Sequence, residues 1–393
     1  MDTITHGIAG ALIGKAVFRG EDMFASKPMN RARIVTWSLM LGAIFPDADI
    51  LRDWFSSNSM LMLTWHRSIT HSLLCMPFFA LALAALTTWF ARWRKWDAPS
   101  FAALTGIYAV GILSHIFLDL VTTFGTMIWS PLGWSRPAWD LIFIIDFTFT
   151  ALILCPQILA WVYRKAEGLK NRAILTWSVL TLASLVATAL LKIVGAPISA
   201  QTALIVILLL TMFFLLPALR FRGVRVGYAT WNRAGLAAAI LYLAGAFVAH
   251  RAALERIEKF AAVFHVKVES LGALPLPPSL WHWDGLINTP QGVYEVRFDL
   301  SERPDLAAIE HRYYPDALPN PYIDAAKRLP EVQKVYWFAR FPVTRFHKER
   351  TNAIVEIYDA RFPQVRRDRP ASFTYRVKMD ESGKIISQGW LKE

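Results

Sequence analysis

Six short motifs with histidine or aspartate lie in the first 150 residues, beside or within apolar segments. Ionisable groups are costly there and usually serve a function. Neutral imidazoles and carboxylates are also ligands for divalent metal ions. We therefore expect a metal site built from several short motifs. These are Asp2-x-x-x-His6, Pro46-Asp47-Ala48-Asp49, His66-Arg67, Thr70-His71-Ser72, His115-x-x-x-Asp119 and Asp146.

The spacing of each motif limits what it can do. His115 and Asp119 are four residues apart, so they share one helix face and can bind one ion or two adjacent ones. That spacing alone is more often a histidine hydrogen-bonded to a carboxylate. His66 and His71 are five residues apart, about 140° around an ideal helix. They can converge only if His66 lies in the loop before the helix, with Ser68 as a cap.

Composition indicates a membrane protein. The chain has 393 residues, of which 55% are hydrophobic, and its mean hydropathy is +0.35. A run of about 20 apolar residues spans the hydrocarbon core of a bilayer. We predict about eight hydrophobic helices, the first two of them short, from the runs at 7–18, 34–46, 72–91, 101–118, 141–163, 173–194, 202–219 and 234–249.

The basic residues predict which loops face the cytoplasm. Loops rich in lysine and arginine stay cytoplasmic, and such loops follow the first, third, fifth and seventh apolar runs. This alternation gives eight passes with both termini outside and places all the acidic and histidine motifs at the outer face. The charges form short clusters, so we expect no nucleic acid partner despite the pI of about 9.8. The basic residues of these loops are Arg19, Lys27, Arg31, Arg33, Arg92, Arg94, Lys95, Arg164, Lys165, Lys170, Arg172, Arg220, Arg222, Arg225 and Arg233.

The character of the chain changes near residue 255. We predict a helical membrane domain over 1–254, a linker over 255–275 and a β-rich extracytoplasmic domain over 276–393. Apolar residues alternate with polar ones at 293–300 and 373–380, which predicts strands with one buried face. Segments 334–346 and 352–359 are predicted as further strands, and Asp380-Glu-Ser-Gly383 as a hairpin turn. Cys75 and Cys155 lie in apolar runs without a CxxC motif, which is typical of packed thiols.

These motifs resemble a known family. Met1-Asp-Thr-Ile-Thr-His-Gly, Phe45-Pro-Asp-Ala-Asp, His66-Arg-Ser-Ile-Thr-His-Ser and His115-Ile-Phe-Leu-Asp-Leu-Val-Thr-Thr-Phe-Gly are similar to the signature of the YdjM-type membrane-bound metal-dependent hydrolases. Ala138-Trp-Asp-Leu-Ile-Phe-Ile-Ile-Asp146 fits the same pattern, although members often have proline in place of Phe147. The family is itself distantly similar to zinc-dependent phospholipase C.

The resemblance implies a hydrolase of the bacterial inner membrane that binds two or three divalent metal ions, with zinc expected. The implied metal ligands are His6, Asp47, Asp49, His66, His71, His115, Asp119 and Asp146. A metal-activated water would cleave a phosphoester, which could be lipid-linked, at the outer membrane face. Asp47 or Asp49 would act as the base, and Arg67 would pair with the phosphate. Asp2 would be a ligand or would orient His6.

Two other classes stay open at the level of sequence. A metal-stabilised scaffold or regulator would use the same ligands to hold helices together. An ion transporter would use them to carry ions, but 173–219 offers only Lys192 as a charged residue. The bilayer is the expected partner, and the oligomeric state is not predicted.

Overall fold

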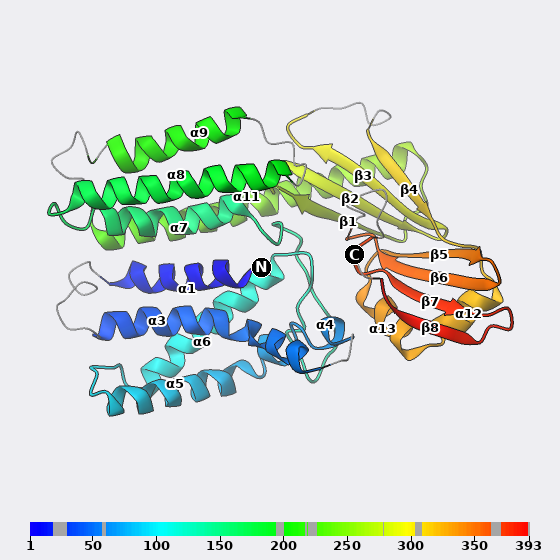
Figure 1. The fold of residues 1–393 in the computed structure, drawn as a ribbon, viewed down its shortest axis with the longest axis horizontal. Coiled ribbons are helices and arrows are strands. Elements are labelled where there is room, and N and C mark those ends of the chain that lie inside the picture. The colour runs from blue at the N-terminus through cyan, green and yellow to red at the C-terminus, as the bar shows by residue number, and fades with distance from the viewer. Residues whose placement is uncertain are drawn as a thin grey trace.

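The protein has a helical half and a β half that lie end to end (Figure 1). The computed structural model describes residues 1–18, 30–56, 60–193, 200–216, 218, 226–277, 279–302, 309–362 and 371–391. Arg19, Lys27, Arg220, Arg222 and Arg225, which belong to the predicted cytoplasmic loops, lie outside these residues.

Each predicted apolar run overlaps a helix, so the prediction of a helical half is confirmed. The helical elements are α1 (Thr3–Val17), α3 (Arg31–Ile44), η1 (Phe45–Phe55), α4 (Leu61–Thr64), η2 (Ile69–His71), α5 (Met76–Trp93), α6 (Phe101–Leu120), α7 (Phe147–Val162), α8 (Leu169–Ile193), α9 (Ala200–Leu210), η3 (Thr211–Leu215) and α11 (Tyr228–Val263).

Polar caps set where several of these helices begin. The side chains of Asp2, Ser100 and Asp146 accept hydrogen bonds from backbone N–H groups in the first turns of α1, α6 and α7. The cap at Asp146 corrects the predicted helix over 141–163, because the residues before Phe147 are not helical.

Fewer helices reach spanning length than the eight passes expected. Within the described residues, three are long and apolar enough to cross a membrane: Arg31–Arg52, Phe101–Leu120 and Tyr228–Val263. A pair bent by 68°, Leu61–His71 with Met76–Trp93, would make a fourth. Phe147–Val162 and Ala203–Leu215 are shorter apolar helices.

The β half consists of two four-stranded antiparallel sheets with strand orders β1-β2-β3-β4 and β5-β6-β7-β8. Two short helices, α12 (Pro321–Lys327) and α13 (Pro330–Phe338), lie between them in the chain. The strands are β1 (Ser270–Leu276), β2 (His282–Thr289), β3 (Gly292–Asp299), β4 (His311–Pro315), β5 (Pro342–Glu349), β6 (Asn352–Asp359), β7 (Tyr375–Met379) and β8 (Ile385–Trp390).

Two features of this half differ from the prediction. The predicted strand over 334–346 is wrong in its first part, because α13 continues to Phe338 and buries Val332, Val335 and Phe338 at helical spacing. The segment expected as a linker, 255–275, holds the end of α11 and most of β1. The long helix α11 therefore leads into the first sheet through the short segment 264–269.

The two halves share a core and an ion pair. Leu63 and Phe124 of the helical half pack in one cluster with Val355 and Val377 of the second sheet. The guanidinium of Arg340 makes two hydrogen bonds, of 2.9 and 2.8 Å, to the buried carboxylate of Asp140. Figure 1 shows the start of α1 and α4 at the end of the bundle that faces the sheets.

Candidate metal centre

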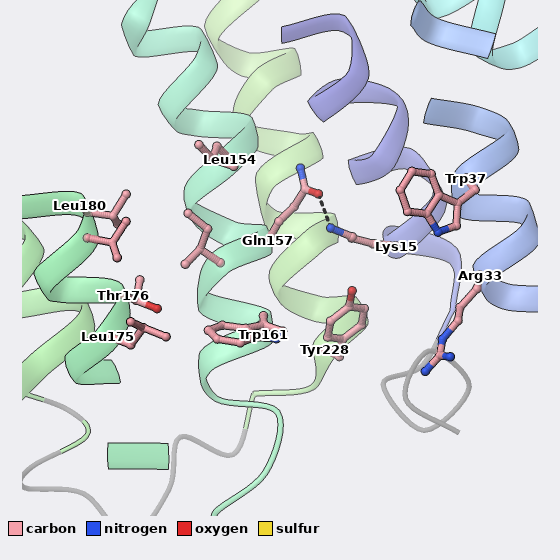
Figure 2. A pocket seen from close by; sticks show the side chains of 12 residues that line it. Lys15, Arg33, Trp37, Leu154, Gln157, Trp161, Leu175, Thr176, Leu180 and Tyr228 are labelled. Carbon is pink, nitrogen blue, oxygen red and sulfur yellow. Dashed lines mark hydrogen bonds between the residues drawn. The ribbon is translucent and has the colours of Figure 1, made fainter. Parts of the chain in front are cut away.

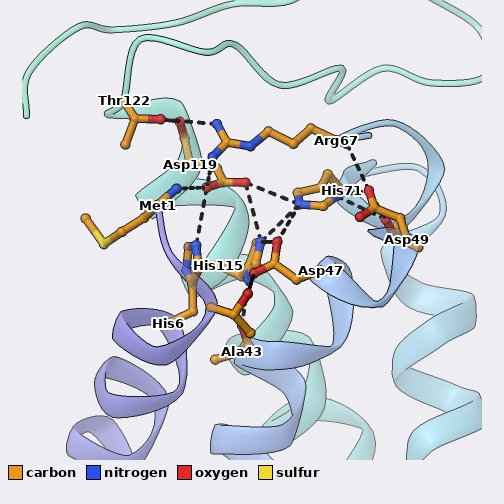
Figure 3. A network of polar contacts seen from close by, with 12 residues as sticks. Met1, His6, Ala43, Asp47, Asp49, Arg67, His71, His115, Asp119 and Thr122 are labelled. Atoms are coloured by element: carbon orange, nitrogen blue, oxygen red, sulfur yellow. Dashed lines mark hydrogen bonds and ion pairs between the residues drawn. The ribbon is translucent and has the colours of Figure 1, made fainter. Parts of the chain in front are cut away.

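Four side chains converge on one point at this end of the bundle (Figure 3). Asp47 follows α3, His71 ends η2, and α6 carries His115 and Asp119 on one face. One ligand atom from each lies within 4.8 Å of those of the others. The Nε2 atoms of His71 and His115 are 3.0 Å apart. They lie 3.2 and 3.4 Å from Asp119 Oδ2.

The arrangement fits a bound cation better than a set of hydrogen bonds. Two Nε2 atoms that face each other can share at most one proton. Asp119 Oδ2 is buried and makes no hydrogen bond of acceptable geometry, and an orphaned carboxylate oxygen in a protein interior is costly. Two imidazoles and two carboxylates suit zinc and other divalent transition metals. The described residues contain one such group, so the expected second and third ions stay a prediction.

Surrounding groups orient the four side chains toward this point. His115 Nδ1 lies 2.6 Å from the carbonyl oxygen of Ala43 and donates to it, which leaves Nε2 with its lone pair facing the centre. His71 Nδ1 lies 3.0 Å from the hydroxyl oxygen of Thr70. The hydroxyl of Thr3 donates to the outer oxygen of Asp47. Thr3 and Ala43 are functional neighbours that sequence reasoning missed, since neither residue type is diagnostic.

Three cations or donors surround the other oxygen of Asp119. Arg67 Nη2 lies 2.9 Å from Asp119 Oδ1, His6 Nε2 lies 3.2 Å away, and the amino group of Met1 also donates to it. In this structure His6, expected as a ligand, contacts the outer side of Asp119 and stacks on His115 with 3.6 Å between ring centroids.

Arg67 is held within the centre. Its side chain is 2% exposed, and Nη1 donates to the hydroxyl of Thr122. Its φ of 59° is left-handed, which is costly for arginine. The guanidinium pairs with Asp119 in this structure, and its expected contact with a substrate phosphate stays a prediction.

Asp49 and His66 form a second layer at the edge of the centre. His66 Nδ1 lies 3.1 Å from Asp49 Oδ1. The other carboxylate oxygen accepts from the backbone N–H of Arg67 and lies 3.5 Å from His71 Nδ1. The His66 side chain is 11% exposed, whereas those of His71 and His115 are fully buried. His66 lies before the short helix η2, as its spacing from His71 requires, but Ser68 makes no capping hydrogen bond.

Two predicted acidic residues serve as helix caps. Asp2 accepts from the backbone N–H and the hydroxyl of Thr5. Asp146, an expected ligand, accepts from the N–H of Phe149 and from the hydroxyls of Tyr242 and Ser279. Its carboxylate is thus engaged elsewhere, and it is not a member of the four-residue group.

Two arginines link the centre to the β half. Arg136 donates to the carbonyl oxygens of Leu63, His66 and Gly125. Burial, together with the charges of Arg67 and Arg361, lowers the pKa of Arg136 to about 9. Arg361 donates to the carbonyl oxygens of Thr123 and Phe338. A lone arginine in a loop gives no signal in sequence, and neither role was predicted.

Comparison with known proteins gives one match. Residues 1–194 match the family model described as YdjM inner membrane protein. This span contains all four residues of the candidate metal group. No curated protein matches the chain, and no solved structure matches it.

Proposed function

We propose that this chain, whose first 194 residues match the YdjM inner membrane protein family, is a membrane-bound metal-dependent hydrolase that cleaves a phosphoester. The observation that carries the proposal is the convergence of Asp47, His71, His115 and Asp119 around an orphaned carboxylate oxygen. The oriented hydrogen bonds behind these side chains support a site built to hold a cation in a fixed geometry.

Each part of the centre has a role in this proposal. A divalent ion held there would supply Lewis-acid activation of water and of a phosphoryl oxygen. Arg67 and His6 engage Oδ1 of Asp119, which leaves Oδ2 as the oxygen that would bind the ion. His66 is the partly exposed imidazole beside the centre, and Asp49 fixes its Nδ1. His66 Nε2 would therefore take up or release the proton that hydrolysis requires.

The proposed substrate has a phosphoester head and an apolar tail. The four ligands lie at the ends of apolar helices, and the β half packs over the same end of the bundle. The basic residues that follow α5 and α7 lie at the end of the bundle away from the sheets (Figure 1), which supports an outward-facing centre and an extracytoplasmic β half. A lipid-linked substrate could then reach the centre from the membrane surface.

One observation favours a scaffold as the second candidate. His71, His115 and Asp119 are fully buried, and a site closed by four protein ligands is typical of structural metal sites. In that case the metal would only hold η1, η2 and α6 together. The partly exposed His66 argues for catalysis.

The test combines metal analysis with a substrate panel. We expect purified protein to contain a divalent metal and to hydrolyse a phosphodiester or phosphomonoester with a lipid tail. His115→Ala and Asp119→Ala should each lower bound metal and activity together, with activity falling by roughly a hundredfold or more. Ser114→Ala, one residue from His115, is the matched control and should retain both.

The outcomes separate the two candidates. Protein that loads metal but hydrolyses no substrate in the panel supports the scaffold. Protein that loads no divalent metal contradicts both.

A further inference from the structure

Figure 2 shows a cavity in the helical half, and no residue of the candidate metal group lines it. Its volume is about 580 Å³, within the range of about 300–1,000 Å³ typical of ligand sites. Side chains of α1, α3, α7, α8 and α11 line it. Lys15 is nine residues after His6 in α1, which separates the two by roughly 14 Å along the helix.

Two cationic side chains line this cavity without a carboxylate among the described lining residues. Lys15 and Arg33 supply the positive charge. Lys15 Nζ donates to Gln157 Oε1 at 2.8 Å, which uses one of its three hydrogens. Gln157 is fixed, because its amide nitrogen donates to the carbonyl oxygens of Ile8 and Ile153. The amide therefore holds the ammonium in place but does not neutralise it.

Aromatic and aliphatic side chains form the rest of the cavity wall. Trp37, Leu175 and Val179 are 51%, 58% and 56% exposed, so they open the cavity laterally from the bundle. Trp161 lines the wall, and the guanidinium of Arg164 lies 5.6 Å from the centre of its ring. An apolar opening beside half-buried cations matches a ligand with an anionic head and hydrocarbon chains. Tryptophan and basic side chains are typical of the level where a bilayer meets water.

We propose that this cavity binds an anionic phospholipid, with the phosphate beside Lys15 and Arg33 and the acyl chains along Trp37, Leu175 and Val179. Basic pockets between membrane helices bind anionic lipid head groups for the same electrostatic reason. The site is separate from the metal centre, so the inference does not depend on the proposed hydrolase activity. The bound lipid would fill the space between α3 and α8 and join the two sides of the bundle.

The test is lipid retention by the full-length protein in detergent, measured by native mass spectrometry. The protein is mixed with equimolar phosphatidylglycerol and phosphatidylcholine. We expect selective retention of phosphatidylglycerol. The double variant Lys15→Met/Arg33→Gln should bind it roughly ten- to thirtyfold more weakly, as expected for the loss of two charges near a membrane surface. Arg92→Gln/Arg94→Gln, which removes two charges outside the cavity, is the matched control and should bind as the wild type does.

Two further measurements test whether the acyl chains contribute to binding and whether the site depends on the metal centre. Inorganic phosphate at millimolar concentration should not displace the lipid, because the acyl chains contribute to binding. Removal of metal with EDTA should leave retention unchanged. Equal retention of both lipids by the wild type would overturn the proposal without the need for a variant. An equal loss of phosphatidylglycerol binding in the two double variants would also overturn the proposal, and so would displacement of the lipid by phosphate alone.

Discussion

Carboxylates are buried at two places in this protein, the candidate metal centre and the first sheet. In Asp119, Oδ1 is surrounded by Arg67, His6 and the Met1 amine, while Oδ2 has no hydrogen bond and faces the ligand cluster. In the first sheet, the carboxylates of Asp284 and Glu295 are each 3% exposed and share a single arginine, Arg297. The hydroxyl of Tyr314 donates to Glu295.

The carboxyl pair in the sheet predicts a pH dependence of stability. Burial and the charge of Glu295 raise the pKa of Asp284 to about 8. The folded protein therefore keeps a proton that the unfolded chain releases near pH 4. Stability should fall as pH rises from about 4 to 8, and it should be flat above that window. Asp284→Asn should remove the slope and stabilise the sheet at pH 8 by at least about 1 kcal/mol, the equivalent of one pKa unit.

Melting temperatures of the purified protein between pH 5 and 9 check this prediction. Glu302→Gln, at an exposed carboxylate, is the control and should keep the wild-type slope. An Asp284→Asn protein that still loses stability over this range would show that another group carries the dependence.

At the scale of elements, the centre depends on how closely α3 approaches α6. A Cβ atom added at Gly111 would lie 2.8 Å from the carbonyl oxygen of Leu39 and 3.1 Å from the nitrogen of Ala43. Gly111 is one turn before His115, whose Nδ1 donates to Ala43. The absence of a side chain at Gly111 thus allows the contact that orients a ligand.

Gly111→Ala should therefore disturb the centre although it touches no ligand. Overpacking costs roughly 1–3 kcal/mol, more than the gain of about 1 kcal/mol from replacing glycine by alanine in a helix. We expect a lower melting temperature and a lower metal content. Gly106→Ala on the same helix, where an added Cβ meets no atom within 4 Å, should leave metal content unchanged. Metal content and melting temperature are measured for both variants. Equal metal content in the two would show that the centre does not depend on the close approach at Gly111.

Periodicity and apolar length predicted most elements of this fold. Every apolar run overlaps a helix, β3 and β7 lie where alternation indicated strands, and β6 lies where a further strand was predicted. The errors in the predicted strands have physical causes. The last residues of α13, 334–338, were predicted as a strand because four of the five are β-branched or aromatic, types that are common in strands. Strand β1 was missed because Pro275 and Pro277 border a segment expected as a linker.

The candidate site was predictable only in its charged residues. Histidine and aspartate in apolar surroundings are costly enough to be noticed, and Asp47, His71, His115 and Asp119 indeed meet. Thr3, the carbonyl of Ala43 and Arg361 were not predictable, because their roles depend on contacts between distant segments. Asp146 lies outside the four-residue group, because its carboxylate caps α7 and accepts from Tyr242 and Ser279. Its expected role as a ligand stays a prediction.

At the scale of the whole molecule, the prediction concerns the orientation of the chain in the membrane. The eight-pass prediction places Ser100 in the cytoplasm and Ser301 outside. Cysteines introduced at these positions, in a background with Cys75→Ala and Cys155→Ala, should be labelled from opposite sides of the membrane. Impermeant maleimide applied to intact and to permeabilised cells provides the measurement. Labelling of both from the same side would refute the pass count and the outward-facing centre.

The hydrogen bond from Arg361 to the carbonyl of Thr123 joins residues 238 positions apart. During synthesis at about 5–20 residues per second, roughly 10–50 s pass between the appearance of the two. His71, His115 and Asp119 are all made before that interval begins, whereas the arginine that supports the segment after α6 is made at its end. A newly made chain would therefore pass through a stage in which the four candidate ligands exist but Arg361, which supports the segment after α6, does not.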